Sequence, residues 1–142
     1  MTPVCIAIID AANARLYSYQ GDPPVFREMR DLVHPGRRSK DRDLLRRAVD
    51  EPREGHRAQW DHEFAKQIVA ECHDLARTRG FEHVIFVASP RVLGELRKVS
   101  EPLRRAGVLV DELERDLTGL SSPQIHDRLA DAHLLDERAR AR

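Results

Sequence analysis

The sequence predicts one three-layer α/β domain that spans residues 1–142 and is built on a mixed five-stranded sheet. Two continuous apolar runs, VCIAII at 4–9 and HVIFVA at 83–88, are typical of strands buried on both faces. Strand-like segments fill the first part of the chain, whereas helical and strand-like segments alternate after residue 58. The expected order is therefore β-β-β-α-β-α-β-α, and 142 residues are enough for one buried core.

The first three strands are expected to pair antiparallel. Asp10 and Asn13 favour a tight turn after the first strand, so residues 14–20 return beside it as a hairpin. The sequence GDPP at 21–24 interrupts the chain, and residues 25–33 predict a third strand. Simple alternation along this third strand puts two sets of side chains on opposite faces: Val25, Arg27 and Met29 on one, and Phe26, Glu28 and Arg30 on the other.

The long helix expected at residues 58–79 carries one apolar stripe. Its members recur at steps of three or four residues: Trp60, Phe64, Ile68, Cys72 and Leu75. We expect Trp60 and Phe64 to anchor the helix to the sheet, and Gly80 to end it.

Two Ser-Pro pairs mark the starts of later helices, since serine is a favoured N-cap and proline is favoured in the first turn. Ser89 precedes a helix whose apolar residues continue to Val99, and Ser122 precedes the last helix. Residues 101–106 predict a short helical turn, and residues 108–113 predict the last strand. The helical crossover between the last two strands favours parallel pairing.

The composition narrows the class of partner and the compartment. Lys+Arg and Asp+Glu are both 24, so no net charge steers the chain to nucleic acid or to a membrane, although a local basic patch stays open. Cys5 and Cys72 lie in apolar patterns and predict buried free thiols in a reducing compartment. The first residues lack the features of a signal peptide, and no apolar run is long enough to span a membrane. We therefore expect a cytoplasmic protein without a membrane partner.

The segment from His34 to Arg57 has neither helical nor strand periodicity, and so long an irregular connection is uncommon unless it is functional or disordered. It carries eight basic and five acidic residues. The basic residues are candidates for RNA contact, because guanidinium groups suit bidentate phosphate binding: Arg37, Arg38, Lys40, Arg42, Arg46, Arg47, Arg53 and Arg57. The alternative is a solvated, partly mobile loop, or a short helix within residues 41–49. The tail at 134–142 is expected to fray.

The carboxylates and histidines predict neither a metal site nor a cofactor site. Asp10 ends a buried strand, as a magnesium ligand does in ribonuclease-H-like folds, but the strand at 83–88 ends without a second carboxylate. A role in the turn is the favoured interpretation of Asp10. His62 and His73 lie about 16 Å apart along one helix, too far to share an ion. Ser89 is explained as an N-cap, and no nucleotide-binding or nucleophile motif occurs, so catalysis is the least favoured function.

Five segments together resemble a bacterial family, the proteins required for attachment to host cells. They are IDAANARLY at 9–17, DLVHP at 31–35, HEFA at 62–65, VASPRVLGELR at 87–97 and ERDLT at 114–118. Their order and spacing extend the resemblance over nearly the whole chain, from Val4 to Leu129.

That family is similar in fold to the middle domain of archaeal and eukaryotic class I release factors and of Pelota. The resemblance therefore implies a ribonuclease-H-like or release-factor-like arrangement. In release factors, the segment before the long helix carries a Gly-Gly-Gln motif for peptidyl-tRNA hydrolysis, whereas residues 54–59 here read EGHRAQ. Contact with RNA or the ribosome without hydrolysis is the function that the resemblance implies. The loop-tip and strand-end candidates are Asp10, Asn13, Arg15, His34, Gly55, His56 and Asp116.

Two functions of different classes follow. One is a non-catalytic RNA- or ribosome-associated module that uses the basic segment and has only an indirect role in attachment. The other is a protein-interaction or regulatory protein that uses a sheet edge or a helix face. Both alternatives stay open at this point, as does the oligomeric state.

Overall fold

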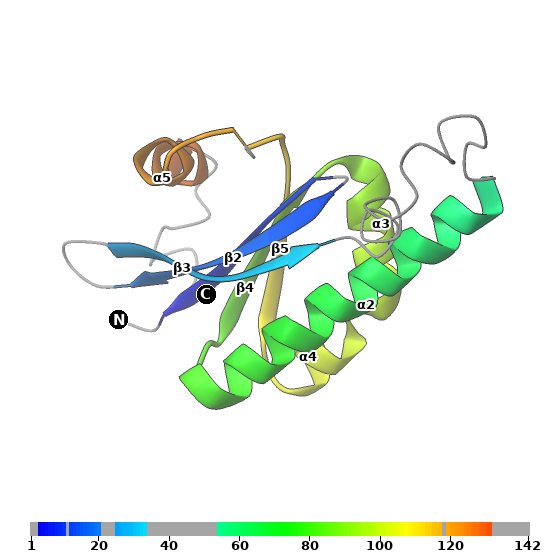
Figure 1. Ribbon diagram of the computed structural model, residues 1–142. Helices are drawn as coiled ribbons and strands as arrows, with labels where there is room; N and C mark the ends of the chain where they lie inside the picture. Colours follow the sequence, from blue (N-terminus) through cyan, green and yellow to red (C-terminus); the bar gives the residue numbers. More distant parts are fainter. Residues whose placement is uncertain (1–2, 11, 21–24, 34–53, 118, 132–142) are drawn as a thin grey trace.

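The computed structural model describes residues 3–10, 12–20, 25–33, 54–117 and 119–131. Its elements follow the expected order: β1 (Val4–Ile9), β2 (Asn13–Gln20), β3 (Val25–Val33), α2 (Glu54–Arg79), β4 (His83–Ala88), α3 (Pro90–Val99), α4 (Glu101–Arg105), β5 (Leu109–Glu114) and α5 (Ser122–Asp131). Figure 1 shows their arrangement. No helix within these ranges is long and apolar enough to cross a membrane.

The five strands form one mixed sheet in the order β3-β2-β1-β4-β5. Strand β2 pairs antiparallel with both β1 and β3, whereas β4 pairs parallel with β1 and β5. The predicted mixed sheet and the predicted parallel crossover are therefore confirmed. The strand order is also compatible with a ribonuclease-H-like arrangement.

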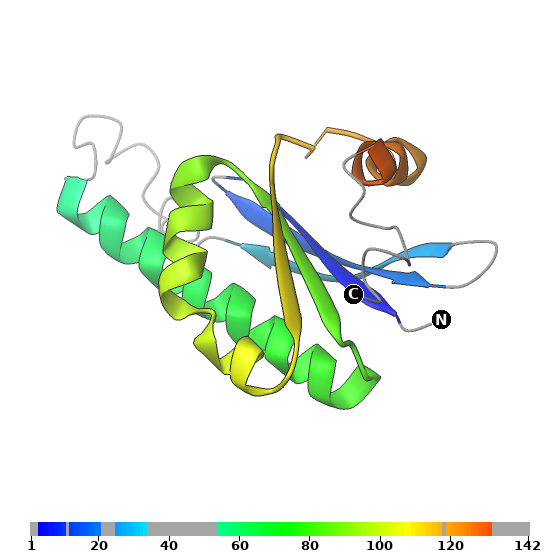
Figure 2. The ribbon, with the colours of Figure 1, turned by 180° about the vertical axis from the view of Figure 1, so that it is seen from behind.

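Helices cover both faces of the sheet, which gives the three layers that the sequence predicts. α2, α3 and α4 lie on one face and α5 lies on the other (Figures 1 and 2). Strand β1 divides its side chains between the two cores, with Cys5 and Ala7 in the cluster on the α2 face and Val4 and Ile6 in the cluster on the α5 face. All residues of β1 and β4 are buried, as their apolar runs predict.

The apolar stripe of α2 packs on the sheet. Phe64 is 3% exposed, and Ile68, Cys72 and Leu75 are fully buried, so the predicted core-facing stripe is confirmed for these residues. The side chain of Trp60 lies outside the described residues. Gly80 follows α2 with a φ of 75°, which agrees with its predicted role in ending the helix.

The two cysteines are free and buried, as expected. Cys5 of β1 and Cys72 of α2 meet in the core between the sheet and the helix. The pKa of the Cys72 thiol is raised well above its usual value, first by a hydrogen bond with the Cys5 thiol and second by burial. Both causes disfavour the thiolate, so Cys72 is expected to be chemically inert in the folded protein.

The start of α2 corrects one expectation from the sequence. The helix begins at Glu54 instead of residue 58, so Gly55, His56 and Arg57 belong to α2 and not to an irregular loop. Glycine has low helix propensity, which hides the start of the helix in the sequence. A glutamate in the first turn favours the earlier start, because its charge suits the positive end of the helix dipole.

A β-bulge between β2 and β3 corrects a second expectation. Arg30 lies opposite Leu16 and Glu28 lies opposite Tyr17, so Met29 is an extra residue in β3. The alternation therefore changes phase at Met29, and Arg30 faces α2 together with Arg27. The predicted placement of Arg30 on the same face as Glu28 is wrong for this reason.

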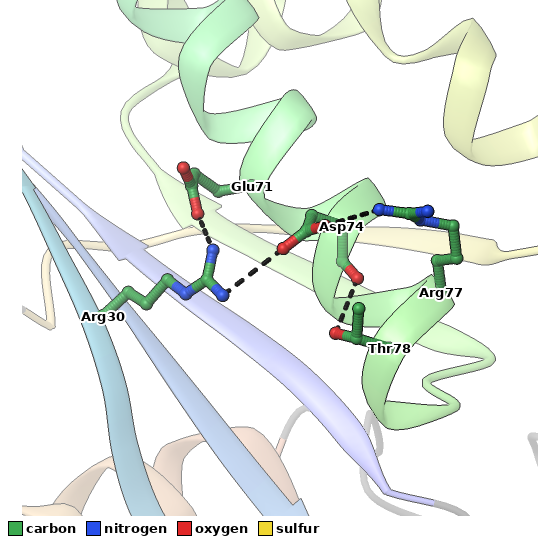
Figure 3. Close-up of polar contacts among 5 residues, drawn as sticks. All are labelled: Arg30, Glu71, Asp74, Arg77 and Thr78. Carbon is green, nitrogen blue, oxygen red and sulfur yellow. Dashed lines mark hydrogen bonds and ion pairs between the residues drawn. The ribbon is translucent and has the colours of Figure 1, made fainter.

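Arg30 uses its position to join the edge of the sheet to α2 (Figure 3). Its guanidinium pairs with Glu71, and its Nη2 lies 3.3 Å from Oδ2 of Asp74. Arg77 also binds Asp74, with 3.0 Å between Nη2 and Oδ1. Arg77 first and Arg30 second lower the pKa of the Asp74 carboxyl group.

The first Ser-Pro pair marks the start of a helix as predicted, whereas the second lies one residue away from its predicted capping position. Ser89 occupies the N-cap position of α3, but its side chain makes no capping hydrogen bond. At α5 the cap is Ser121 instead of Ser122. The Gln124 Oε1 accepts a hydrogen bond of 2.9 Å from the Ser121 N–H, while the Ser121 Oγ accepts one of 3.4 Å from the Gln124 N–H. This reciprocal pair is a capping box. In the sequence SSPQ the capping box starts at Ser121, one residue before the Ser-Pro pair.

Candidate functional site

The carboxyl ends of β1, β4 and β5 meet at one edge of the sheet. The chain leaves β1 towards β2 on one side and leaves β4 towards α3 and β5 on the other, so the strand connections diverge between β1 and β4. In open α/β sheets, ligands bind in the crevice that such a divergence creates. Strand β3 runs in the same direction as β1 and ends at this edge too.

A cleft of about 460 Å³ occupies this position. We call it the strand-end cleft, and its lining residues are Ile9, Asp10, Ser89, Pro90, Glu114, Arg115 and Asp116. Three carboxylates and one guanidinium make the lining acidic, so it does not favour a phosphate group. Within the described ranges, no group of three or more histidine, cysteine, aspartate or glutamate residues could hold a metal ion.

Asp10 shapes the turn between β1 and β2. Its Oδ1 accepts two hydrogen bonds of 2.6 Å, from the backbone N–H groups of Ala12 and Asn13. The Asp10 N–H also donates to the Asn13 carbonyl oxygen at 2.9 Å. The structure therefore confirms that Asp10 is a turn-forming residue.

Ser89 and Pro90 bring the start of α3 into the strand-end cleft. The first turn of α3 contains no acidic residue, and the Ser89 side chain does not cap it. The positive end of the helix dipole thus faces a lining that carries carboxylates from β1 and β5. Arg91 ties the same turn to α2 through an ion pair of 2.7 Å with Asp61.

The described lining of the strand-end cleft combines one hydroxyl group with three carboxylates. Ser89 supplies its only lining hydroxyl, and no histidine or cysteine is among the described residues that line it. A nucleophilic serine needs an adjacent base that removes its proton. The described lining offers three carboxylates, Asp10, Glu114 and Asp116, as groups that could accept a proton.

The structure brings some of the predicted site residues together and separates others. Asp10 and Asp116 both line the strand-end cleft. Asn13 lies beside it at the start of β2, where its Nδ2 is 3.5 Å from Oδ1 of Asp31. Arg15 is exposed on β2, and a hydrogen bond with Tyr17 is the main cause that raises its pKa. Gly55 and His56 lie in the first turn of α2.

Most of the predicted basic candidates lie outside the described residues. This holds for His34, Arg37, Arg38, Lys40, Arg42, Arg46, Arg47 and Arg53, and for the side chains of His56 and Arg57. The tail at 134–142 also lies outside them.

Sequence reasoning missed the two other charged residues that line the cleft, Glu114 and Arg115. The predicted last strand ended at Leu113, one residue too early, so these charged side chains were not recognised as strand-end residues. The charged run ERD directly after an alternating strand is the signal that could have found them.

Comparison with known proteins gives one family and a set of distant structural likenesses, two of which are described below. A family model described as "Protein required for attachment to host cells" matches residues 5–129. No curated protein matches the chain.

Two solved structures of Ppx/GppA family proteins from Aquifex aeolicus are similar, one of them described as a type II variant of the phosphatase. The type II variant is 15% identical with a TM-score of 0.47, and 80% of this chain covers 36% of it. The other is 19% identical with a TM-score of 0.42, and 80% of this chain covers 35% of it. The chain thus spans about a third of the length of these proteins. Similarities this weak do not support a shared function.

The comparisons do not support the expected likeness to release factors and Pelota. They do support the expected family, because the matching model covers most of the 142 residues. The protein belongs to the family of proteins required for attachment to host cells.

Proposed function

We propose that this protein is a non-catalytic, cytoplasmic module that contacts RNA or the ribosome through its basic segment at residues 34–57, and that its role in attachment is indirect. The observation that supports the proposal most is where this segment joins the fold. It leaves β3 at Val33, at the carboxyl edge of the sheet, and enters α2 at Glu54. The Arg91–Asp61 pair holds the first part of α2 beside the start of α3, which opens at the same edge.

The charges of the strand-end cleft and of the basic segment indicate which of the two would bind RNA. The strand-end cleft is acidic, so a polyanion gains nothing from it. The basic segment has eight Lys/Arg against five Asp/Glu, and arginine is well suited to bidentate phosphate contact. Affinity for RNA would therefore come from the segment, while the folded domain holds its two ends.

The experiment is binding to purified ribosomes and to a fluorescent single-stranded RNA at graded salt. Replacement of Arg37, Arg38, Arg46 and Arg47 with glutamine should weaken binding and flatten its salt dependence, because fewer counterions are released. A matched control replaces four exposed basic residues on the helices with glutamine: Lys66, Lys98, Arg105 and Arg128. The control variant loses the same charge and should bind as the natural protein does.

Two results would count against the proposal. Equal binding by the natural protein and the segment variant would exclude the segment as the contact and favour the protein-interaction function. Because residues 54–59 lack a Gly-Gly-Gln motif, we expect no hydrolysis of peptidyl-tRNA. Robust hydrolysis by the natural protein would therefore exclude a non-catalytic role.

A further inference from the structure

A second hollow lies away from the strand-end cleft, where the edge of the sheet passes the end of α2. We call it the β3 groove; its volume is about 380 Å³, and its lining residues are Ser18, Gln20, Val25, Arg27, Met29 and Arg79. Arg27 lies opposite Ser18 and Val25 lies opposite Gln20, so these side chains share the α2 face of the sheet. Arg79 reaches the groove from the last turn of α2.

The β3 groove is basic. Among its described lining residues are two guanidinium groups and no carboxylate. Within the described ranges, neither Arg27 nor Arg79 forms an ion pair. Arg30, three residues after Arg27 on β3, differs because it binds Glu71 and Asp74 of α2. Both side chains are exposed, so their charges are available to an anionic partner.

The same place also offers main-chain and apolar contacts. β3 is an edge strand of the described sheet, so its outer N–H and C=O groups can pair with another extended chain. Val25 is 51% exposed, which is unusual for a large apolar side chain in this protein. Met29 lies further along the groove and packs against the larger core cluster.

We propose that the β3 groove binds an extended acidic polypeptide segment, which adds to β3 as a further antiparallel strand. The main chain of the partner pairs with the regular part of β3 before the bulge, at Val25–Glu28. Its carboxylates meet Arg27 and Arg79, and its apolar side chains cover Val25. RNA is a poorer match, because none of the described lining residues is aromatic and could stack on a base.

The geometry of β3 predicts the sequence pattern of the partner segment. Arg27 and Val25 are two positions apart on one face, so an antiparallel partner needs an acidic residue followed two positions later by an aliphatic one. The side chain between them points to the opposite face and can be small and polar. A parallel partner would need the reverse order.

The test uses the full-length protein and a fluorescent peptide in which glutamate and valine alternate at every second position, with serine between them. The protein should bind this peptide about tenfold more tightly than a peptide with lysine in place of glutamate. The double variant Arg27→Glu, Arg79→Glu should lose about tenfold in affinity for the glutamate peptide. The control variant Arg105→Glu, Arg128→Glu, at exposed sites on α4 and α5, should bind it as the natural protein does.

Amide chemical shifts locate the contact. The glutamate peptide should shift the signals of Val25–Glu28 and of Arg79, and thermal unfolding should show that both double variants are folded. Equal binding of the two peptides, loss of binding in the control variant, or shifts confined to other strands would overturn the proposal. A single-stranded RNA that needs Arg27 and Arg79, with no binding of the glutamate peptide, would also overturn it. These outcomes do not depend on the basic segment, so they are distinct from those of the RNA proposal.

Discussion

The two faces of the sheet are covered in different ways. On one face α2, α3 and α4 pack on the sheet and on one another, and ion pairs link the layers, as in Arg30–Glu71 and Arg97–Glu112 (Figures 2 and 3). On the other face the described cover is α5, which buries Ile125 and Leu129. One face is therefore braced by neighbouring helices, whereas α5 is the one described helix on the other face and can be loosened separately.

The largest effect is expected from the braced face. Phe86 of β4 is 1% exposed and belongs to the cluster on the α2 face. Phe86→Ala should lower the free energy of unfolding by about 3–5 kcal/mol, because it removes buried apolar area and leaves a cavity. Denaturant unfolding measures this value. A loss under about 1 kcal/mol would show that the braced face does not dominate stability.

A smaller effect is expected from the face that α5 covers. Leu129 is fully buried, and Leu129→Ala should cost about 2 kcal/mol, the low end for such a change, because α5 packs beside no other described helix and can shift to close part of the cavity. Amide exchange should speed up in α5 and stay unchanged in α2.

Cys72 gives an independent readout for the same variant. Its raised pKa and its burial between β1 and α2 predict slow alkylation in the folded protein. The thiol should remain as unreactive in Leu129→Ala as in the natural protein. Fast alkylation would mean that the two faces of the sheet open together.

The smallest effect is expected from the ion pairs of the braced face. Arg30 and its partner Glu71 are 38% and 33% exposed at the side chain, so solvent screens their attraction. Arg30→Gln should therefore cost less than about 1 kcal/mol. Denaturant unfolding of Arg30→Gln and Phe86→Ala would compare their losses in free energy of unfolding. Equal losses in the two variants would contradict the prediction.

The same substitution should change the titration of Asp74. The folded protein lowers the pKa of this carboxyl group, so its contribution to stability is present above the unfolded pKa and is lost as the pH falls through the folded one. Arg30→Gln should raise the pKa of Asp74, and Arg77→Gln should raise it more, because Arg77 is the larger cause. Carboxyl NMR titration measures both shifts, and an unchanged pKa in Arg30→Gln would show that the pair does not form in solution.

The elements that could be predicted from the sequence are those whose pattern is local. β1 and β4 are buried on both faces, so their apolar runs are continuous and their bounds were predicted correctly. The bulge at Met29 was missed because VFREMRDLV alternates imperfectly along its whole length, so the sequence does not mark where the phase changes; the change follows from pairing with β2. The strand-end cleft was found only in part, since Asp10, Ser89 and Glu114 are far apart in the chain and meet only when three strands align.

The bulge also bears on whether two molecules can join through their β3 edges. Without it, VFREMRDLV would pair with itself about a two-fold axis at Met29, with Arg27 opposite Asp31 and Glu28 opposite Arg30. With it, Arg27 and Arg30 share one face, and Glu28 and Asp31 share the other. The two antiparallel registers that use most of the strand then place Arg27 against Arg30, or Glu28 against Asp31, and like charges repel. The extra residue at Met29 therefore disfavours pairing between the β3 edges of two molecules. Val25–Glu28 still has the regular geometry that a strand of another protein can pair with.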